Sequence, residues 1–337
     1  MLLNAAVAAR GVSGTATALT ALERALECLS VDWTRVAPPD VGRRGLRRAI
    51  DDAVWDMYRA PRAGAGDVII HPANVGGDHR GIQSCLIVHD TMVLDFPQWY
   101  DKRYAAYARA LIPLSVRRAA VVVTPSRASR ASIVRRWPRA QVTVLPWPSV
   151  VPVVARPRER PRSRNVVMIA ATEPRKNHWL AIDAVRMARI ITGEDITLTL
   201  IGARGIVEEG VQAYAHICDP LRSWIFRRQL LRDSELVAAL DDAWVAILPS
   251  SHEGYGLPLI EASARALPTL HSGAGAMAEV MPEGIVQGGA FDYALALADL
   301  LDAEQYERAS RATYATAGRH AGTVFASGLK DILEGVT

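Results

Sequence analysis

Two glutamates, two glycines and a proline stand close together in the run from Ser250 to Ala262, which reads Ser-Ser-His-Glu-Gly-Tyr-Gly-Leu-Pro-Leu-Ile-Glu-Ala. The run follows an apolar stretch, residues 244–249, that is short enough for a buried parallel strand. Pro258 is of the residue type favoured at the first position of a helix, so a helix is expected to begin near Leu257. The glycines allow a tight turn whose N–H groups, with the positive end of the helix, form an anion pocket. A diphosphate fits such a pocket.

The two glutamates, Glu253 and Glu261, are expected to face hydroxyl groups, because like charges would repel the diphosphate. Glu253 lies in the turn and can accept hydrogen bonds from a sugar ring. Glu261 lies at the end of the first helical turn and can accept from a ribose diol. The alternative is that Glu253 is a solvated loop carboxylate and Glu261 only complements the helix dipole.

This spacing, a glutamate followed by seven residues and a second glutamate, resembles the signature of the retaining family 4 (group 1) glycosyltransferases. The resemblance extends over nearly all of residues 1–320, with specific motifs at residues 172–178 and 249–262. It implies an α/β fold of the GT-B type: two facing Rossmann-like domains with an interdomain cleft, the donor on the second and the acceptor on the first. It also implies transfer of a hexose-type sugar from a nucleoside-diphosphate-sugar to an acceptor hydroxyl with retention, with Glu253 contacting the donor sugar and Glu261 the nucleotide ribose.

A second basic motif, Ala-Ala-Thr-Glu-Pro-Arg-Lys-Asn-His at residues 170–178, follows the first predicted strand of the second half and opens a helix. Arg175 offers a planar fork of donors and Lys176 a compact charge, and both can neutralise a leaving nucleoside diphosphate. The stretch resembles the basic clamp of the family, although alanines stand where many members carry a further arginine. The alternative is a generic exposed basic pair.

Three segments of the first half resemble parts of the family that border the cleft. Gly14 ends the loop after the first strand, where the backbone can approach a ligand; an ordinary turn is the alternative. His89 stands at the carboxyl end of an apolar strand, where open α/β sheets bind ligands. The resemblance places this histidine near the transferred sugar, and a histidine hydrogen-bonded at a strand end is the alternative. Ser126 lies in a strand-loop-helix segment.

The expected catalytic residues are therefore His89, Glu253, Arg175 and Lys176. The expected donor-binding residues follow predicted strands of both halves and are Gly14, Ser126, Gly202, Gly254, Tyr255, Gly256, Leu257 and Glu261. No metal ligand and no cofactor are expected, because the chain lacks an Asp-x-Asp motif and the nucleotide-sugar is a co-substrate. The resemblance implies that the departing phosphate takes the acceptor's proton, so no protein base is assigned.

Short apolar strand candidates alternate with amphipathic helical stretches, which is the pattern of parallel α/β sheets. The predicted strands lie near residues 2–8, 31–36, 68–71, 86–89, 121–124, 142–145, 166–170, 197–201, 245–248 and 269–271. The predicted helices lie near residues 15–29, 46–58, 102–118, 128–136, 178–191, 234–240, 259–266, 293–301 and 304–315.

The 337 residues suit two domains. Residues 1–150 are expected to form an N-terminal acceptor-side domain and residues 166–320 a C-terminal nucleotide-sugar-binding domain. Residues 151–165, rich in proline and arginine, are expected to form a linker. Residues 321–337 are expected to form a C-terminal helix, which can pack back on the N-terminal domain.

The net charge of +4 hides a strong asymmetry: residues 1–155 carry +8, residues 156–165 carry +4 and residues 166–337 carry −8. The basic first half can dock on anionic lipid at the inner face of the membrane, bind an anionic acceptor, or be a solvated surface. No nucleic-acid partner is expected, because the arginines are not interleaved with aromatic residues in a binding motif. Three widely spaced cysteines and the lack of an apolar run of about 18 residues favour a cytoplasmic protein.

Two other functions stay open. One is another two-domain nucleotide-sugar enzyme, such as an epimerase or a phosphorylase, and the other is a catalytically silent relative that binds a nucleotide-sugar. The run Gly273 to Ala278 mimics a dinucleotide fingerprint, but it lies late in the chain without a complete first βαβ unit. No motif distinguishes the nucleotide base, the sugar, the oligomeric state or the acceptor, which can be a carbohydrate, a lipid-linked molecule or a small molecule.

Overall fold

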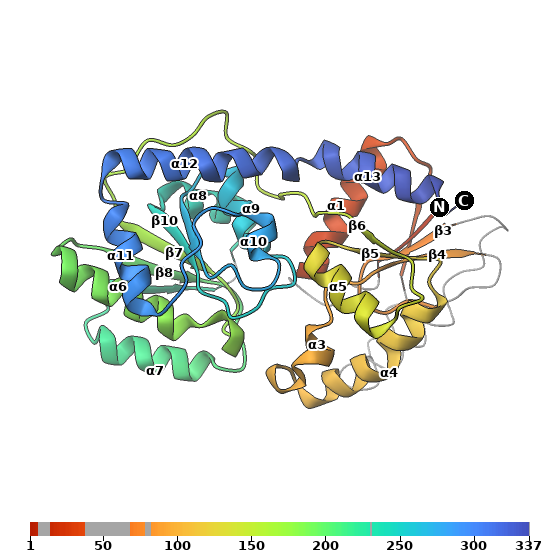
Figure 1. The fold of residues 1–337 in the computed structure, drawn as a ribbon, viewed down its shortest axis with the longest axis horizontal. Coiled ribbons are helices and arrows are strands. Elements are labelled where there is room, and N and C mark those ends of the chain that lie inside the picture. Colours follow the sequence, from red (N-terminus) through yellow and green to blue (C-terminus); the bar gives the residue numbers. More distant parts are fainter. Residues whose placement is uncertain (6–13, 38–67, 78–81, 230, 337) are drawn as a thin grey trace. The chain divides into compact units, whose positions relative to one another are not determined.

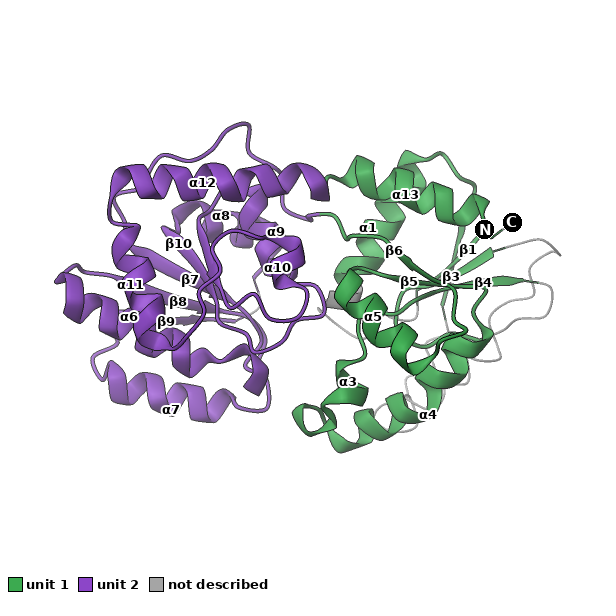
Figure 2. Cartoon of the chain, in the orientation of Figure 1, with its two compact units in different colours: residues 1–148, 321–337 green, residues 149–320 purple. Residues whose placement is uncertain are grey.

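The computed structural model describes residues 1–5, 14–37, 68–77, 82–229 and 231–336, with side chains in the second range described from residue 17 on. The chain divides into two compact units, one of residues 1–148 and 321–337 and the other of residues 149–320 (Figure 2). The helix predicted near residues 46–58 and most of the loop before Gly14 lie outside the described residues.

The first unit is built on a six-stranded sheet in the order β2-β1-β3-β4-β5-β6, and all of its neighbouring strands run parallel (Figure 1). Its strands are β1 (Leu2–Asn4), β2 (Thr34–Val36), β3 (Val68–His71), β4 (Gln83–Ile87), β5 (Val121–Thr124) and β6 (Val142–Val144). Its helices are α1 (Gly14–Cys28), α3 (Met92–Asp95), the 3₁₀ helix η3 (Pro97–Trp99), α4 (Lys102–Arg118), α5 (Arg127–Arg136) and α13 (Gly322–Glu334).

Local sequence explains where the main helices of this unit begin and end. Asp101 caps α4 by accepting hydrogen bonds from the N–H groups of Arg103 and Tyr104, and Arg117 and Arg118 complement the dipole in its last turn. The buried face of α4 packs with strands β4 and β5 in one apolar cluster. Among the helices of the described ranges, none combines the length and the apolar composition needed to cross a bilayer.

The carboxyl-terminal helix α13 belongs to the first unit and packs against α1. The rings of Trp147 and Phe325 lie 4.9 Å apart between centroids. Gly328 lies so close to Leu145 that a Cβ at this position would approach the leucine side chain to 2.7 Å. Apolar contacts therefore join the end of the chain to the unit in which the chain begins.

The second unit is built on a five-stranded parallel sheet in the order β11-β10-β7-β8-β9. Its strands are β7 (Asn165–Ile169), β8 (Thr197–Ile201), β9 (Ile225–Arg228), β10 (Val245–Leu248) and β11 (Thr269–His271). Its helices are the 3₁₀ helix η4 (Pro174–Lys176), α6 (His178–Thr192), α7 (Glu208–Cys218), α8 (Asp233–Asp242), α9 (Leu257–Ala264), α10 (Met277–Val280), α11 (Ala290–Asp299), α12 (Ala303–Ala317) and the 3₁₀ helix η5 (Gly318–His320). Strands β7, β8 and β10 supply buried aliphatic side chains to a core that α6 and α11 cover.

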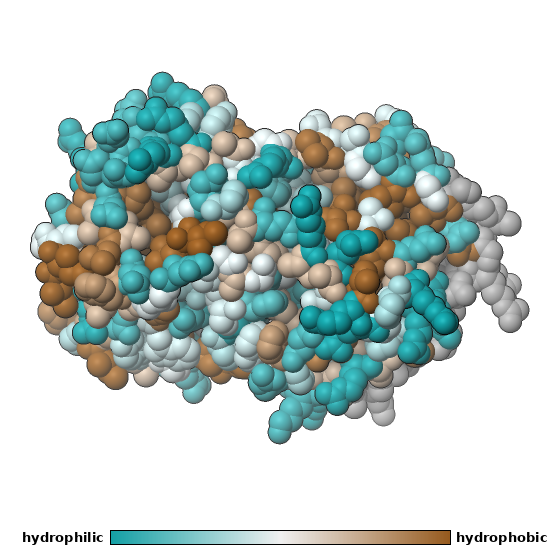
Figure 3. Space-filling model, in the orientation of Figure 1, coloured by the Kyte–Doolittle hydropathy of each residue, from teal (hydrophilic) through white to brown (hydrophobic). Residues whose placement is uncertain are grey.

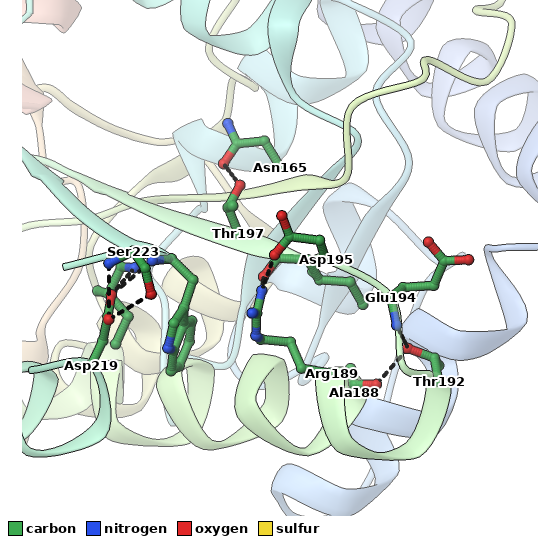
Figure 4. A network of polar contacts seen from close by, with 12 residues as sticks. Asn165, Ala188, Arg189, Thr192, Glu194, Asp195, Thr197, Asp219 and Ser223 are labelled. Carbon is green, nitrogen blue, oxygen red and sulfur yellow. Dashed lines mark hydrogen bonds and ion pairs between the residues drawn. The ribbon is translucent and has the colours of Figure 1, made fainter. Parts of the chain in front are cut away.

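The edge strand β9 and the helix α7 before it were not predicted from the sequence. Polar groups define the end of α7 and the start of β9. The buried carboxylate of Asp219, just after α7, accepts hydrogen bonds from the N–H groups of Ser223, Trp224 and Ile225 (Figure 4). Burial raises the pKa of this carboxyl, but the three N–H donors outweigh burial and lower it. The turn that starts β9 therefore depends on one aspartate, a signal that hydrophobic periodicity does not detect.

The proline- and arginine-rich segment that was expected as a linker belongs to the second unit. Arg158 donates to the carbonyl oxygen of Leu240 at 2.7 Å and to that of Asp241, near the end of α8, and its own N–H donates to Ser310. The last carbonyl groups of a helix lack partners within the helix, and an arginine fork satisfies them. Arg158 therefore anchors this segment to the second unit.

Candidate active site

The strand order of the second unit reverses between β7 and β10, because β8 flanks β7 on the side opposite to β10. Open α/β sheets bind ligands outside the carboxyl ends of the strands at such a switch point. The two motifs singled out in the sequence follow these two strands: residues 170–177 come after β7 and residues 249–256 after β10. The fold therefore brings both motifs to one edge of one sheet.

Side chains of the two loops meet in a buried ion-pair cluster. Lys176 Nζ lies 2.5 Å from Glu253 Oε1, and Arg175 Nη1 lies 2.8 Å from Glu253 Oε2. The second terminal nitrogen of Arg175 lies 2.8 Å from Glu173 Oε2. Lys176 is 8% exposed and Glu253 is 5% exposed, so neither is a solvated surface charge. The alternatives of an exposed basic pair and a solvated loop carboxylate are excluded.

The environment of Glu253 keeps its carboxyl ionised. Burial raises its pKa, but the charges of Lys176 and Arg175 outweigh burial and lower the pKa to about 2. A carboxylate has about four lone-pair positions, of which Lys176, Arg175 and the side chain of Ser250 occupy three. Glu253 can therefore hold both cations and still accept a hydrogen bond from a hydroxyl group of a ligand.

Backbone geometry fixes the basic loop in place. Pro174 opens η4, and Asn177 ends it in the left-handed conformation with φ 57° before α6 starts. The N–H of Ser251 donates to the carbonyl of Arg175 at 2.8 Å, which joins the loop after β7 to the loop after β10. The backbone of Arg175 and Lys176 is therefore fixed by the geometry of η4 and by a hydrogen bond from the loop after β10.

The turn before α9 forms as the sequence predicts, with Leu257 as the first helical residue and Pro258 as the second. Gly256 is the N-cap and has φ +100°, a conformation that side-chain-bearing residues rarely adopt. The preceding residue, Tyr255, is buried, and its hydroxyl lies 2.9 Å from Nδ1 of His320. Gly254 lies between this tyrosine and the ion-paired Glu253.

Glu261 is buried in α9, one turn after the N-cap, with 9% of its surface exposed. It has no hydrogen-bond or ion-pair partner among the residues that the structure describes. Burial, and to a smaller extent the negative charge of Asp233, raises its pKa from an ordinary 4.5 to about 7. A role limited to complementing the helix dipole does not explain a buried carboxyl, because that role is performed by exposed carboxylates in the first turn.

Two further glycines shape the loops. Gly202, with φ +149°, lies at the end of β8, and a Cβ there would come within 2.2 Å of the carbonyl oxygen of Ala170. Gly275, with φ +68°, lies against Glu253, and a Cβ there would come within 2.2 Å of the Glu253 carbonyl oxygen. Ala276 N also donates to that carbonyl at 2.9 Å. The run at residues 273–278, which resembles a dinucleotide fingerprint, thus packs against the backbone of Glu253 and holds it in place.

The first unit contains the other predicted residues. His89 donates its N–H to Asn74 Oδ1, and its Nε2 lies 2.9 Å from the carbonyl oxygen of Pro72. Because a carbonyl can only accept, Nε2 carries the proton when the ring is neutral, and burial lowers the pKa of this histidine. Ser126 is buried and caps α5 by accepting from Ser129 N, and Gly14 is the first residue of α1.

Residues 155–317 match the family described as glycosyl transferases group 1. This part of the chain is a group 1 glycosyltransferase domain. It contains the whole ion-pair cluster, Glu261 and the supporting glycines, and the resemblance seen in the sequence is confirmed.

Two curated relatives are mannosyltransferases. The O-antigen chain mannosyltransferase B of Escherichia coli is 24% identical over 242 residues, which is 64% of this chain and 59% of the relative. The MMP alpha-(1->4)-mannosyltransferase of Mycolicibacterium hassiacum is 34% identical over 138 residues, which is 38% of this chain and 31% of the relative. The chain therefore spans less than two thirds of the length of either protein.

Solved structures confirm the fold. HepE of Anabaena, in complex with UDP and glucose, has a TM-score of 0.69 at 14% identity, covering 99% of both chains. Sucrose-phosphate synthase of Thermosynechococcus elongatus has a TM-score of 0.71 at 14% identity, covering 99% of this chain and 98% of its own. The α/β fold of this chain, with its parallel sheets, is that of GT-B glycosyltransferases.

Proposed function

We propose that the chain is a retaining glycosyltransferase that moves a hexose from a nucleoside-diphosphate-sugar to an acceptor hydroxyl. The observation that carries this proposal is Glu261, a buried carboxyl one turn into the helix that follows the switch-point turn, for which the described residues provide no partner. An uncompensated buried carboxyl destabilises the fold, and such groups cluster at functional sites. A ribose diol would give it the two hydrogen bonds that the protein does not provide.

The ion-pair cluster supplies the electrostatics of the reaction. A diphosphate bound at the turn before α9 meets N–H groups of the backbone and the cations of Arg175 and Lys176 from the neighbouring loop. These groups stabilise the negative charge that grows on the diphosphate as the sugar departs. Glu253 holds both cations in position and keeps one lone-pair position for a sugar hydroxyl. The departing phosphate takes the proton of the acceptor, so no protein base is assigned.

We propose that this arrangement replaces a metal ion. Two fixed cations and a helix N-terminus can meet the charge of a diphosphate without a divalent ion. Turnover is expected to persist in EDTA. Complete loss of turnover, restored by magnesium or manganese, would contradict this part of the proposal.

The relatives narrow the choice of donors to test. Both curated relatives are named mannosyltransferases, whereas similar solved structures are complexes with UDP and GlcNAc or with UDP-glucose. A panel of guanosine and uridine diphosphate sugars of mannose, glucose and N-acetylglucosamine therefore covers the donors to try first. Thermal shift identifies the nucleotide that binds, and release of nucleoside diphosphate from the matching donor distinguishes an active enzyme from a silent relative.

We propose that the protein is cytoplasmic and that its first unit, the acceptor side, docks on anionic lipid at the inner face of the membrane. Helix α4 carries five exposed cations and no acidic residue, and Tyr104 and Leu114 are exposed beside them. Hydrophilic side chains gather over the part of this unit where α4 and α5 lie (Figure 3). Basic helices with exposed aromatic residues bind anionic lipid.

The surface is tested by sedimentation with vesicles. The wild-type chain is expected to sediment with phosphatidylglycerol vesicles at low salt and not with pure phosphatidylcholine vesicles. Arg109→Glu with Arg117→Glu is expected to abolish sedimentation, whereas Arg308→Glu with Arg311→Glu, an equal charge change on exposed positions of α12, is expected to preserve it. Equal sedimentation of both double variants would contradict docking through α4.

A further inference from the structure

Tyr255 and His320 join two parts of the second unit that are 65 residues apart in the chain. The Tyr255 hydroxyl lies 2.9 Å from His320 Nδ1, and the two rings meet edge to face with centroids 6.0 Å apart. Both side chains are buried, at 7% and 6% exposed. Tyr255 belongs to the turn between Glu253 and Gly256, whereas His320 ends the short helix η5.

His320 also occupies a special place in the chain. It is the last residue of the second unit before the chain returns to the first, and Ser149 is the first residue of the second unit. The N–H of Ser149 donates to the carbonyl oxygen of His320 at 3.1 Å. His320 is therefore hydrogen-bonded to Tyr255 of the turn through its side chain and to Ser149 through its backbone. Ser149 lies where the chain enters the second unit, and His320 lies where the chain leaves it.

The turn needs an anchor of this kind. Gly254 and Gly256 give its backbone more conformational freedom than any other residue type would allow. A turn that binds a diphosphate through its N–H groups contributes most when those groups already point at the ligand, since ordering them on binding costs free energy. Glu253 is fixed on one side of the turn by its two cations. On the other side, the buried tyrosine with its hydroxyl bonded to His320 is a second fixed point.

We propose that His320 is a positioning residue for the phosphate-binding turn, acting through Tyr255, and that ligand binding at the turn is thereby transmitted to the chain crossing at Ser149. This inference rests on the proposed function, because it assumes a nucleoside diphosphate at the turn. His320 itself need not touch the donor. Its contribution is to keep Tyr255, and with it the N–H groups of the turn, in one orientation.

The test is a double-mutant cycle read by calorimetric titration of UDP, or of GDP if the wild-type chain prefers it. Tyr255→Phe keeps the ring and removes only the hydroxyl, and it is expected to weaken nucleotide binding roughly fivefold, as the loss of one net hydrogen bond does. His320→Ala is expected to weaken binding by a similar factor. Because both changes break one interaction, the double variant is expected to bind no more than about twofold worse than either single variant.

Two further variants separate positioning from general stability. His320→Asn places an amide near the position of Nδ1 and is expected to restore binding to within about twofold of wild type. His216→Ala, a matched change at an exposed histidine of α7, is expected to leave binding unchanged. A lower melting temperature with wild-type nucleotide affinity in both Tyr255→Phe and His320→Ala would show that the pair is only structural and would overturn the proposal.

Hydrogen exchange tests whether ligand binding at the turn affects the backbone at Ser149. UDP or GDP is expected to slow exchange of the Ser149 amide in the wild-type chain and to leave it unchanged in Tyr255→Phe. Equal slowing in both proteins would overturn the link to the crossing. If the wild-type chain binds neither nucleotide, the proposed function fails; if it binds one and the variants bind equally well, only this inference fails.

Discussion

Glu253 and Glu261 lie eight residues apart on one turn and one helix, and their surroundings shift their carboxyl pKa values in opposite directions. Burial is the largest influence on both. Two cations overcome it at Glu253 and hold its pKa at about 2, whereas within the described ranges no cation compensates Glu261, whose pKa is raised to about 7. Two carboxyl groups with diverging pKa values mark two different roles. In the proposed function, Glu253 is an anion that holds the two cations, and Glu261 is a carboxyl that gains its hydrogen bonds from the ligand.

The first prediction concerns stability without ligand. The pKa of Glu261 is higher in the folded than in the unfolded chain, so the folded chain binds its proton more tightly. The contribution of this proton to the free energy of unfolding is therefore fully present below pH 4.5 and is lost as the pH rises through about 7. Glu261→Gln is therefore expected to stabilise the unliganded protein at pH 8 by up to about 3 kcal/mol, which is the size of such a shift. The same variant is expected to bind nucleotide roughly ten- to a hundredfold more weakly, since hydrogen bonds to a charged group are lost.

Glu209→Gln, at an exposed position of α7, is the matched control and is expected to change neither quantity. Thermal unfolding at pH 5 and pH 8 and calorimetric titration measure both effects. A Glu261→Gln variant that binds nucleotide with wild-type affinity would show that this carboxyl does not contact the ribose.

The second prediction concerns protons. A ribose diol donates best to an ionised carboxylate, so nucleotide binding is expected to lower the pKa of Glu261 and to release a proton near pH 6.5. Affinity is therefore expected to rise with pH up to about 7 and then to level off, apart from changes due to the phosphate itself. Titrations in two buffers with different ionisation enthalpies count the protons. Wild type and Glu261→Gln releasing equal numbers would contradict the linkage.

The third prediction concerns Lys176. Lys176→Ala leaves the buried Glu253 with Arg175 alone, so it is expected to lower stability by about 1 to 3 kcal/mol. It is also expected to lower kcat/KM about a hundredfold, because one fixed charge beside the departing diphosphate is lost. Lys330→Ala removes an exposed lysine from a surface pair and is expected to change neither value measurably. Wild-type turnover by Lys176→Ala would assign the diphosphate to Arg175 and the turn alone.

The fourth prediction separates backbone strain from support of the site. Gly275→Ala and Gly193→Ala both place an alanine at a positive φ, at +68° and +69°, which is expected to cost about 1 to 2 kcal/mol of stability. Gly275→Ala is expected to cost more, because its Cβ would also come within 2.2 Å of the Glu253 carbonyl oxygen. Only Gly275 faces the Glu253 backbone, whereas a Cβ at Gly193 meets nothing within 4 Å. Gly275→Ala is therefore expected to lose donor turnover beyond its loss of stability. Equal kcat/KM in the two variants would show that Glu253 tolerates displacement.

The sequence predicted the elements that periodicity and turn chemistry encode. The start of α9 at Leu257 follows from Gly256 and Pro258, and the place of both motifs after β7 and β10 follows from the alternation of strands and helices. The spacing of the two glutamates also led directly to the group 1 family, which residues 155–317 match.

Other features depend on contacts between distant residues and so left no local signal. Nothing adjacent in the chain shows that Lys176 and Glu253 share a buried ion pair, or that Tyr255 reaches His320. The role of Gly275 depends on the approach of another loop. Residues 151–165 were predicted to form a linker from their proline and arginine content, whereas helix-end carbonyl groups bind Arg158 to the second unit. That Glu261 is buried without a partner among the described residues becomes visible only after packing is known.

The account is tested most directly by following the reaction of the wild-type chain with its best nucleotide-sugar donor by NMR. We predict release of the nucleoside diphosphate together with a first-formed product whose anomeric configuration equals that of the donor, and roughly ten- to a hundredfold slower formation of both by Glu261→Ala at donor concentrations below KM. A product of inverted configuration, or no release of nucleoside diphosphate from any donor that binds, would contradict it.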